Sequence, residues 1–276
     1  YVMADKSTAQ VKITAGIITF HDAYNYGAVL QCVALLLFLR RCGIEASVID
    51  YSMDAYVELR KKKPIKTFMR RLYNLLQDPI SVLKTRLNEH RKQEYTRPYQ
   101  NMLKIRNQSF DDFKREYLMF TEKRYHTFSE LIDNPPFFDV YICGSDQIWN
   151  PRFLDFDANY FLQFAPIYKR IAYAPSFGVR RIPAIYNKEL QRRIQQIPYL
   201  SIREKSGADI IKEICGVTVD VLVDPTFLVD AETWKNIASK SNVKLPEKYI
   251  LTYFIGIDEY IQKALDEIER MFPNHT

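Results

Sequence analysis

The chain has 276 residues, of which 47% are hydrophobic, so it can form a large core and global disorder is excluded. Its formal net charge of +6 is uneven, because the segment from Glu58 to Arg124 holds 18 Lys and Arg against 8 Asp and Glu. The four cysteines form no C-x-x-C pair and lie in apolar surroundings, which favours buried reduced thiols. The start lacks a hydrophobic signal region and no apolar run is long enough to span a bilayer, so we expect a soluble, cytoplasmic protein.

The first predicted unit is a strand, a helix and a second strand. The strands cover residues 11–20 and 45–51, and between them an apolar helix over residues 28–42 ends at Gly43. This order predicts two parallel strands and a buried helix. The unit has no G-x-G-x-x-G fingerprint, so we expect no dinucleotide site.

The loop before this helix contains Asn25, Tyr26 and Gly27. A helix N-terminus with a nearby glycine can seat a phosphate or a carboxylate. Asn25 can equally serve only as the cap of the helix.

Residues 55–125 interrupt the α/β pattern and are interpreted as a basic helical insertion. An amphipathic helix over residues 65–76 has Lys66, Arg70 and Arg71 on its polar side. Such a helix can contact the anionic inner face of a membrane or pack its apolar face on its own domain. Further helices are predicted near residues 82–95 and 110–117. No nucleic-acid motif accompanies the basic residues, so we expect no nucleic-acid partner.

Four predicted strands follow the insertion, over residues 138–143, 169–174, 199–202 and 219–223. Each is followed by polar residues, namely Ser145, Asp146, Gln147, Ser176, Arg203, Glu204 and Asp224. The carboxyl ends of the strands are where open α/β sheets bind ligands. The pattern predicts a doubly wound, mostly parallel, Rossmann-like sheet of about six strands over residues 11–228.

Residues 229–276 are predicted as a connector and the start of a second α/β domain. The connector is a helix over residues 230–239, and a strand over 248–255 and a helix over 258–271 follow. One such pair cannot cover both faces of a sheet, so this unit either joins the first sheet or begins a second α/β domain. We favour the second reading and expect that domain to be truncated in the chain.

Five stretches, in family order, resemble the polysaccharide pyruvyl transferase family. They are Gly16–His21 with Asn25–Gln31, Asp139 with Gly144–Pro151, Ala174–Gly178, Ser201–Gly207, and Asp224–Thr226 with Trp234. The resemblance implies a two-domain fold similar to the glycosyltransferase B architecture, with the active site between the domains. It also implies transfer of pyruvate from phosphoenolpyruvate to two sugar hydroxyls as a ketal, in bacterial cell-surface exopolysaccharide biosynthesis. Phosphoenolpyruvate is then a co-substrate, no cofactor is needed, and the acceptor is an oligosaccharide, lipid-linked or free.

Roles for single residues come from this chemistry and from the resemblance. Arg203 is the leading donor-binding residue, because a guanidinium fork suits both anions of phosphoenolpyruvate and the family's Ser-x-Arg motif places a donor-contacting arginine there. Asp146 and Glu204 are the candidate catalytic carboxylates. The other candidates are Ser176, Asn25 and Gly27 for the donor, and Tyr26, Ser145, Gln147, Trp149 and Asn150 for the acceptor. No cluster has zinc or magnesium spacing, so we expect no metal.

The chain departs from the family pattern at its C-terminal end. The family usually carries a catalytic histidine and a further basic donor-binding residue in a C-terminal motif, which this chain does not reach. His275 matches nothing in that motif, and His21 can take part or be a structural histidine. We therefore expect little or no activity from this chain alone. Two alternatives stay open: a nucleotide-sugar-dependent glycosyltransferase, and a non-catalytic module in polysaccharide assembly.

Overall fold

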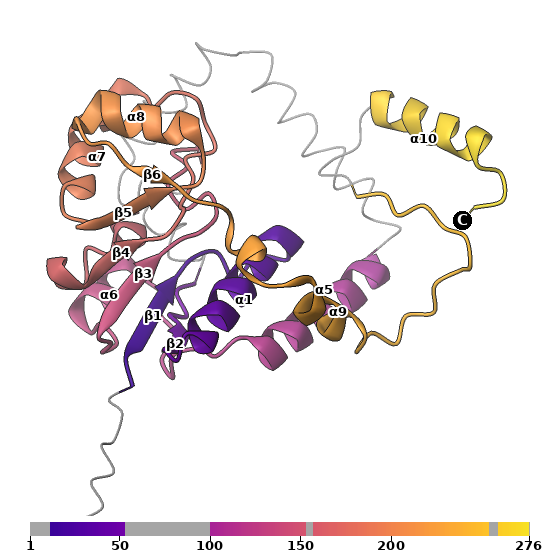
Figure 1. Ribbon diagram of the computed structural model, residues 1–276, viewed down its shortest axis with the longest axis horizontal. Helices are drawn as coiled ribbons and strands as arrows, with labels where there is room; N and C mark the ends of the chain where they lie inside the picture. The colour runs from indigo at the N-terminus through magenta and orange to yellow at the C-terminus, as the bar shows by residue number, and fades with distance from the viewer. Residues whose placement is uncertain (1–11, 53–99, 153–156, 254–258, 276) are drawn as a thin grey trace, which may run out of the picture. The chain divides into compact units, whose positions relative to one another are not determined.

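A computed structural model of the protein describes residues 12–52, 100–152, 157–253 and 259–275 (Figure 1). The chain divides into two compact units, Tyr1–Val229 and Asp230–Thr276. Each unit is described by itself below.

The first unit is built on one sheet of six parallel strands in the order β2-β1-β3-β4-β5-β6. The strands are β1 (Thr14–Ile18), β2 (Glu45–Val48), β3 (Val140–Cys143), β4 (Arg170–Ala172), β5 (Tyr199–Ile202) and β6 (Asp220–Val221). From β1 the chain moves outward to β2, and from β3 onward it moves in the opposite direction. The topological switch point therefore lies between β1 and β3, and the predicted doubly wound α/β fold is confirmed.

Helices cover both faces of the sheet. Alternate residues of a strand point to opposite faces, so Ile17 of β1 packs with α1 (Tyr26–Arg41) and α5 (Gln100–Tyr117), whereas Ile18 lies in the other core cluster. That second cluster contains residues from α6 (Phe128–Asp133), α7 (Asn187–Ile194) and α8 (Lys205–Cys215). Among the described residues, short 3-10 helices lie in the connections: η2 (Ala158–Phe161), η3 (Ile167–Lys169), η4 (Ala184–Tyr186) and η5 (Pro225–Leu228).

The strands are shorter than predicted, with the exception of β5. In the first strand the ladder stops at Ile18, and Thr19 and Phe20 bond to other loops and to α1 instead. The helix α5 is longer than predicted and begins at Gln100. The helices predicted at residues 65–76 and 82–95 lie outside the described residues.

Within the described ranges, no helix has both the length and the apolar character needed to cross a membrane.

The cysteines are free, but only three of them are buried. Cys32, Cys143 and Cys215 lie in the core, whereas Cys42 is exposed where α1 ends. The prediction of a buried thiol was therefore wrong for Cys42, because this residue is the C-cap of α1, where Arg40, Arg41 and Gly43 are exposed as well.

The second unit contains α9 (Ala231–Ala238) and α10 (Glu259–Met271). The predicted strand over residues 248–255 is not formed over residues 248–253, which are the part of it that the structure describes. A strand needs a neighbour to bond its backbone N–H and C=O groups, and the described residues of this unit supply none.

Candidate functional site

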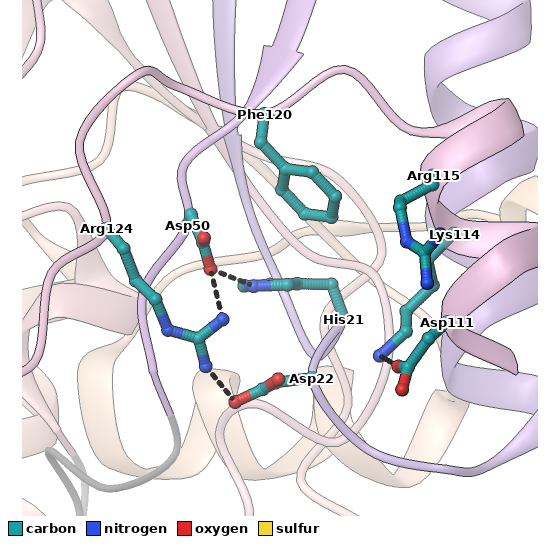
Figure 2. Close-up of a pocket in the computed structure, with 8 residues that line it drawn as sticks. All are labelled: His21, Asp22, Asp50, Asp111, Lys114, Arg115, Phe120 and Arg124. Carbon is teal, nitrogen blue, oxygen red and sulfur yellow. Dashed lines mark hydrogen bonds and ion pairs between the residues drawn. The ribbon is translucent and has the colours of Figure 1, made fainter. Parts of the chain in front are cut away.

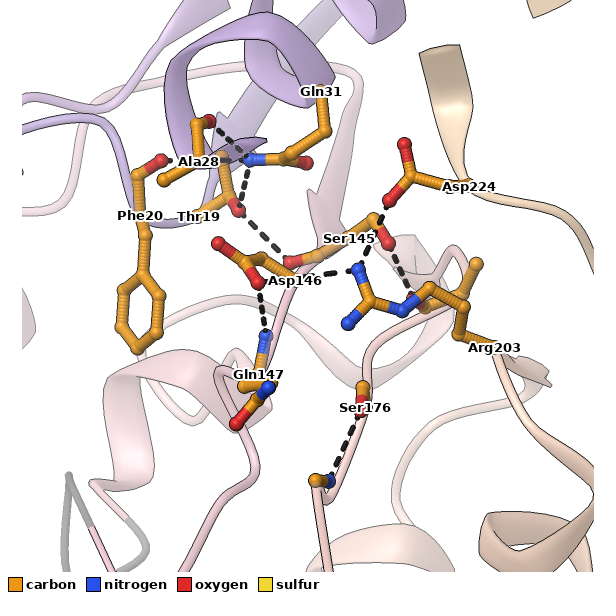
Figure 3. Close-up of polar contacts among 12 residues, drawn as sticks. Thr19, Phe20, Ala28, Gln31, Ser145, Asp146, Gln147, Ser176, Arg203 and Asp224 are labelled. Carbon is orange, nitrogen blue, oxygen red and sulfur yellow. Dashed lines mark hydrogen bonds and ion pairs between the residues drawn. The ribbon is translucent and has the colours of Figure 1, made fainter. Parts of the chain in front are cut away.

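The loops after β1 and β3 are joined at the switch point. Thr19 Oγ1 donates a hydrogen bond of 2.9 Å to the backbone oxygen of Ser145 and accepts one of 3.0 Å from Gln31 Nε2. Ser145 Oγ donates to the backbone oxygen of Ala174 at 2.6 Å, which ties the loop to β4 as well. The Oε1 atom of Gln31 is buried and has no hydrogen-bond partner among the described residues. Figure 3 shows these contacts beside the charged residues described next.

Three charged residues from three strand ends form a group that we call the Arg203 corner: Asp146, Arg203 and Asp224 (Figure 3). Arg203 Nη1 lies 2.9 Å from Asp224 Oδ2 and 3.9 Å from Asp146 Oδ1. Asp224 is held in place because its Oδ1 accepts hydrogen bonds from the backbone N–H and the hydroxyl of Thr226. Arg203 thus pairs with Asp224 and leaves Asp146 only loosely compensated.

Asp146 has an unusual environment for a carboxylate. Burial raises its pKa, and the negative charge of Asp224 adds to this effect. The backbone N–H of Gln147, at 2.8 Å from Oδ1, and the charge of Arg203 oppose the rise without cancelling it. Asp146 therefore holds a proton to a higher pH than an ordinary aspartate, which suits an acid or base in proton transfer.

Glu204 is oriented away from this corner. Its Oε1 accepts hydrogen bonds from Ser176 Oγ at 3.1 Å and from the backbone N–H of Phe177 at 3.0 Å. Ser176 Oγ in turn accepts from the backbone N–H of Gly178. The carboxylate of Glu204 therefore braces the loop after β4 against the start of α8.

The structure does not offer Trp149 or Asn150 to a sugar, contrary to the prediction. Trp149 is fully buried, with its ring stacked on Phe161 and its Nε1 donating to the backbone oxygen of Tyr160. Asn150 is also buried, and its amide donates to Gln147 Oε1. Ser145 is buried as well and its hydroxyl is used internally. These residues shape the loop after β3 and do not line an open surface.

The start of α1 contains the remaining predicted residues. Asn25 accepts a hydrogen bond of 3.1 Å from the backbone N–H of Ala28 and so caps the helix. Tyr26 is 48% exposed, and its ring centroid lies 4.7 Å from that of Phe110. No hydrogen bond or ion pair joins Asn25 or Gly27 to the described residues of the Arg203 corner.

A second polar group lies at the ends of β1 and β2, around a cavity of about 310 Å³ that we call the His21 pocket (Figure 2). Its lining residues are His21, Asp22, Asp50, Asp111, Lys114, Arg115, Phe120 and Arg124. Sequence reasoning placed only His21 at this edge. Asp22 follows His21 in the loop after β1. The other six lining residues come from the β2 end and from the segment interpreted as an insertion, and no local motif marked them.

Ion pairs hold the His21 pocket together. Arg124 contacts Asp22 at 2.8 Å and Asp50 at 3.5 Å, and His21 Nε2 lies 3.0 Å from Asp50. Burial acts to raise the pKa of Asp50, but the hydrogen bond from His21 and the positive charges around it outweigh burial and lower the pKa. Asp50 therefore stays ionised to a lower pH than an ordinary aspartate.

Metal ligands are not clustered in the parts of the chain that the structure describes. There, no group of three or more His, Cys, Asp or Glu residues is placed to hold a metal ion.

Fold and site together define an α/β protein whose charged residues gather at the switch point of a parallel sheet, where this architecture binds small ligands. A family model described as polysaccharide pyruvyl transferase matches residues 25–270, which is most of the chain. The chain belongs to this family, and its membership supports a role in pyruvyl transfer in polysaccharide biosynthesis. Searches of curated proteins and of solved structures returned no significant match.

Proposed function

We propose that the protein transfers pyruvate from phosphoenolpyruvate to two hydroxyls of a saccharide, giving a ketal and phosphate, in bacterial cell-surface polysaccharide biosynthesis. The observation that carries the proposal is the bonding of Arg203. Only its Nη1 has a partner among the described residues, so Nη2 and Nε are available to an anion. Phosphoenolpyruvate has a phosphate and a carboxylate, and both match a guanidinium fork.

The start of α8 supports the same donor. The helix begins at Lys205, directly after Arg203 and Glu204, and its N-terminus carries a partial positive charge that favours an anion. Glu204 at the N-cap makes no side-chain capping bond, because its carboxylate is bound to Ser176 and Phe177. The first-turn N–H groups are therefore left uncovered by the cap side chain.

Asp146 is the proposed proton carrier. The reaction adds a proton to the methylene carbon of the enol, and a sugar hydroxyl then attacks the neighbouring carbon. A second hydroxyl displaces phosphate, and the two hydroxyl protons pass to the departing phosphate and to the base. Asp146, with its raised pKa, gives the first proton and recovers one from a hydroxyl.

Thermal stabilisation of the full-length protein tests the donor. Phosphoenolpyruvate at about a hundredfold excess over its Kd should raise Tm by about 5 °C, while UDP- and GDP-sugars should not. Arg203→Ala should abolish the shift, and Arg192→Ala, at an exposed arginine of α7, should preserve it. A shift with a nucleotide sugar alone would favour a glycosyltransferase. No shift with any donor, with or without saccharide, would overturn the proposal.

A further inference from the structure

We propose that the His21 pocket binds an uncharged pyranose ring, and, given the proposed function, that this ring belongs to the saccharide acceptor. Three of the five residues first considered for the acceptor, Ser145, Trp149 and Asn150, have almost no exposed surface. The pocket, by contrast, is a cavity of about 310 Å³ at the same edge of the sheet. This volume is at the lower end of the range for small-molecule sites, about 300 to 1,000 Å³, and so suits a single sugar ring.

The charges of the pocket favour a neutral ligand. Arg124 is paired with Asp22 and Asp50, and Lys114 with Asp111 at 2.9 Å. The third cation, Arg115, is paired with Asp112, which lies next to the lining residues in α5. An anion would have to compete with these carboxylates for the cations. A sugar hydroxyl instead donates to a carboxylate oxygen and accepts from a guanidinium, and leaves the ion pairs intact.

The pocket has a rigid polar base and an apolar wall. His21 is only 2% exposed and is held at both nitrogens, with Nδ1 3.2 Å from the backbone oxygen of Thr19 and Nε2 3.0 Å from Asp50. His21 is therefore a positioning residue that fixes Asp50. The half-buried ring of Phe120 lies beside it, with centroids 5.3 Å apart, and provides the flat apolar surface that the C–H face of a pyranose needs (Figure 2).

Thr19 connects the pocket to the Arg203 corner. Its backbone oxygen faces His21, and its hydroxyl bonds to Ser145, the residue before Asp146. The strands β1 and β3 that precede these loops are direct neighbours, about 5 Å apart. A saccharide in the pocket therefore lies beside the loop that carries Asp146, and its hydroxyls can extend toward the donor.

Saturation-transfer NMR on the full-length protein tests this assignment. The probes are the methyl glycosides of glucose, galactose and mannose, and inorganic phosphate is the competitor. We expect at least one glycoside to bind, unaffected by phosphate. Arg124→Gln and Phe120→Leu should each weaken it about tenfold, as expected when a charge-assisted hydrogen bond or an aromatic contact is lost. Arg106→Gln, at an exposed arginine of the same region outside the pocket, should bind like wild type.

The outcomes separate the pocket from the donor proposal. Glycoside binding that survives Arg203→Ala supports the pocket, even if phosphoenolpyruvate fails to bind to the wild-type protein. Phosphoenolpyruvate binding without any glycoside signal overturns the pocket and leaves the donor proposal standing. The pocket proposal is also overturned if phosphate displaces the glycoside. It is likewise overturned if both pocket variants bind the glycoside as well as the wild-type protein does. Phe120→Leu changes no charge, so it still decides the question if Arg124→Gln does not fold.

Discussion

The Arg203 corner and the His21 pocket stand on either side of the same switch point, and both combine arginine with aspartate. In the corner, Asp146 is 3.9 Å from its cation and burial raises its pKa. In the pocket, Asp50 has a partner at 3.0 Å and its pKa is lowered. The pKa of an aspartate is thus shifted in opposite directions in the two regions, because the direction depends on whether the buried carboxylate has a close positive partner. The corner suits anion binding and proton transfer, and the pocket suits a neutral polar ligand.

The largest difference between the two regions should appear in turnover. In the full-length protein, Arg203→Ala should lower phosphoenolpyruvate-dependent transfer about 100-fold to 1,000-fold, as loss of one preorganised charged donor does. Arg124→Gln should cost about tenfold, mainly in the KM for the acceptor. Phosphate release, with donor and acceptor varied separately, measures both effects. If both variants raised the KM for the donor alike, the two regions would form a single anion site.

Trp149→Ala tests whether the loop after β3 is core or binding surface. Removing a fully buried indole should lower the free energy of unfolding by about 3 to 5 kcal/mol. The matched control is Trp234→Ala in α9, where the indole is only half-buried and the loss should be smaller. Urea denaturation gives both values. Unchanged stability together with lost glycoside binding would return Trp149 to the acceptor site.

Glu204→Gln tests whether Glu204 only holds the loop after β4 in place or also takes part in the reaction. It weakens the two hydrogen bonds to Ser176 and Phe177, so the free energy of unfolding should fall by about 1 to 3 kcal/mol, with Tm lower by about 2 to 4 °C per kcal/mol. Glu213→Gln, at an exposed position of α8, should have little effect. Calorimetry measures Tm, and phosphoenolpyruvate binding should be retained. A variant of normal stability without turnover would instead make Glu204 catalytic.

The smallest effects concern the pH dependence of stability. The pKa of Asp146 is raised on folding, so its contribution is fully present below the unfolded value and is lost as pH rises through the folded value. Asp146→Asn should therefore stabilise the protein at neutral pH. The pKa of Asp50 is lowered, so its contribution is present above the unfolded value and is lost as pH falls through the folded value. Asp50→Asn should destabilise the protein at neutral pH.

Denaturation of both variants at pH 7 and at a pH below the ordinary aspartate pKa of about 3.9, where the folded value of Asp50 lies, measures these effects. Both differences from wild type should shrink in acid. Effects of the same sign at neutral pH would contradict the electrostatic distinction between the corner and the pocket.

The sheet and the corner were largely predictable from the sequence. Each strand is a short apolar run, and the polar residues that follow it must lie at one edge when the strands are parallel. Arg203, Asp146 and Asp224 could thus be expected at the same edge. The His21 pocket could not be predicted from the sequence, because Asp50 and Arg124 are distant in sequence and neither follows a recognisable motif.

Local pattern alone therefore determined the order of strands and helices, the polar edge and the resemblance to a pyruvyl transferase. Only the tertiary structure decided which polar and aromatic side chains face that edge. Trp149 and Arg203 both follow strands, yet Trp149 is buried against Phe161 while Arg203 stays partly exposed. The physical reason is that burial and charge pairing arise from contacts between distant segments, and periodicity within one segment carries no record of those contacts.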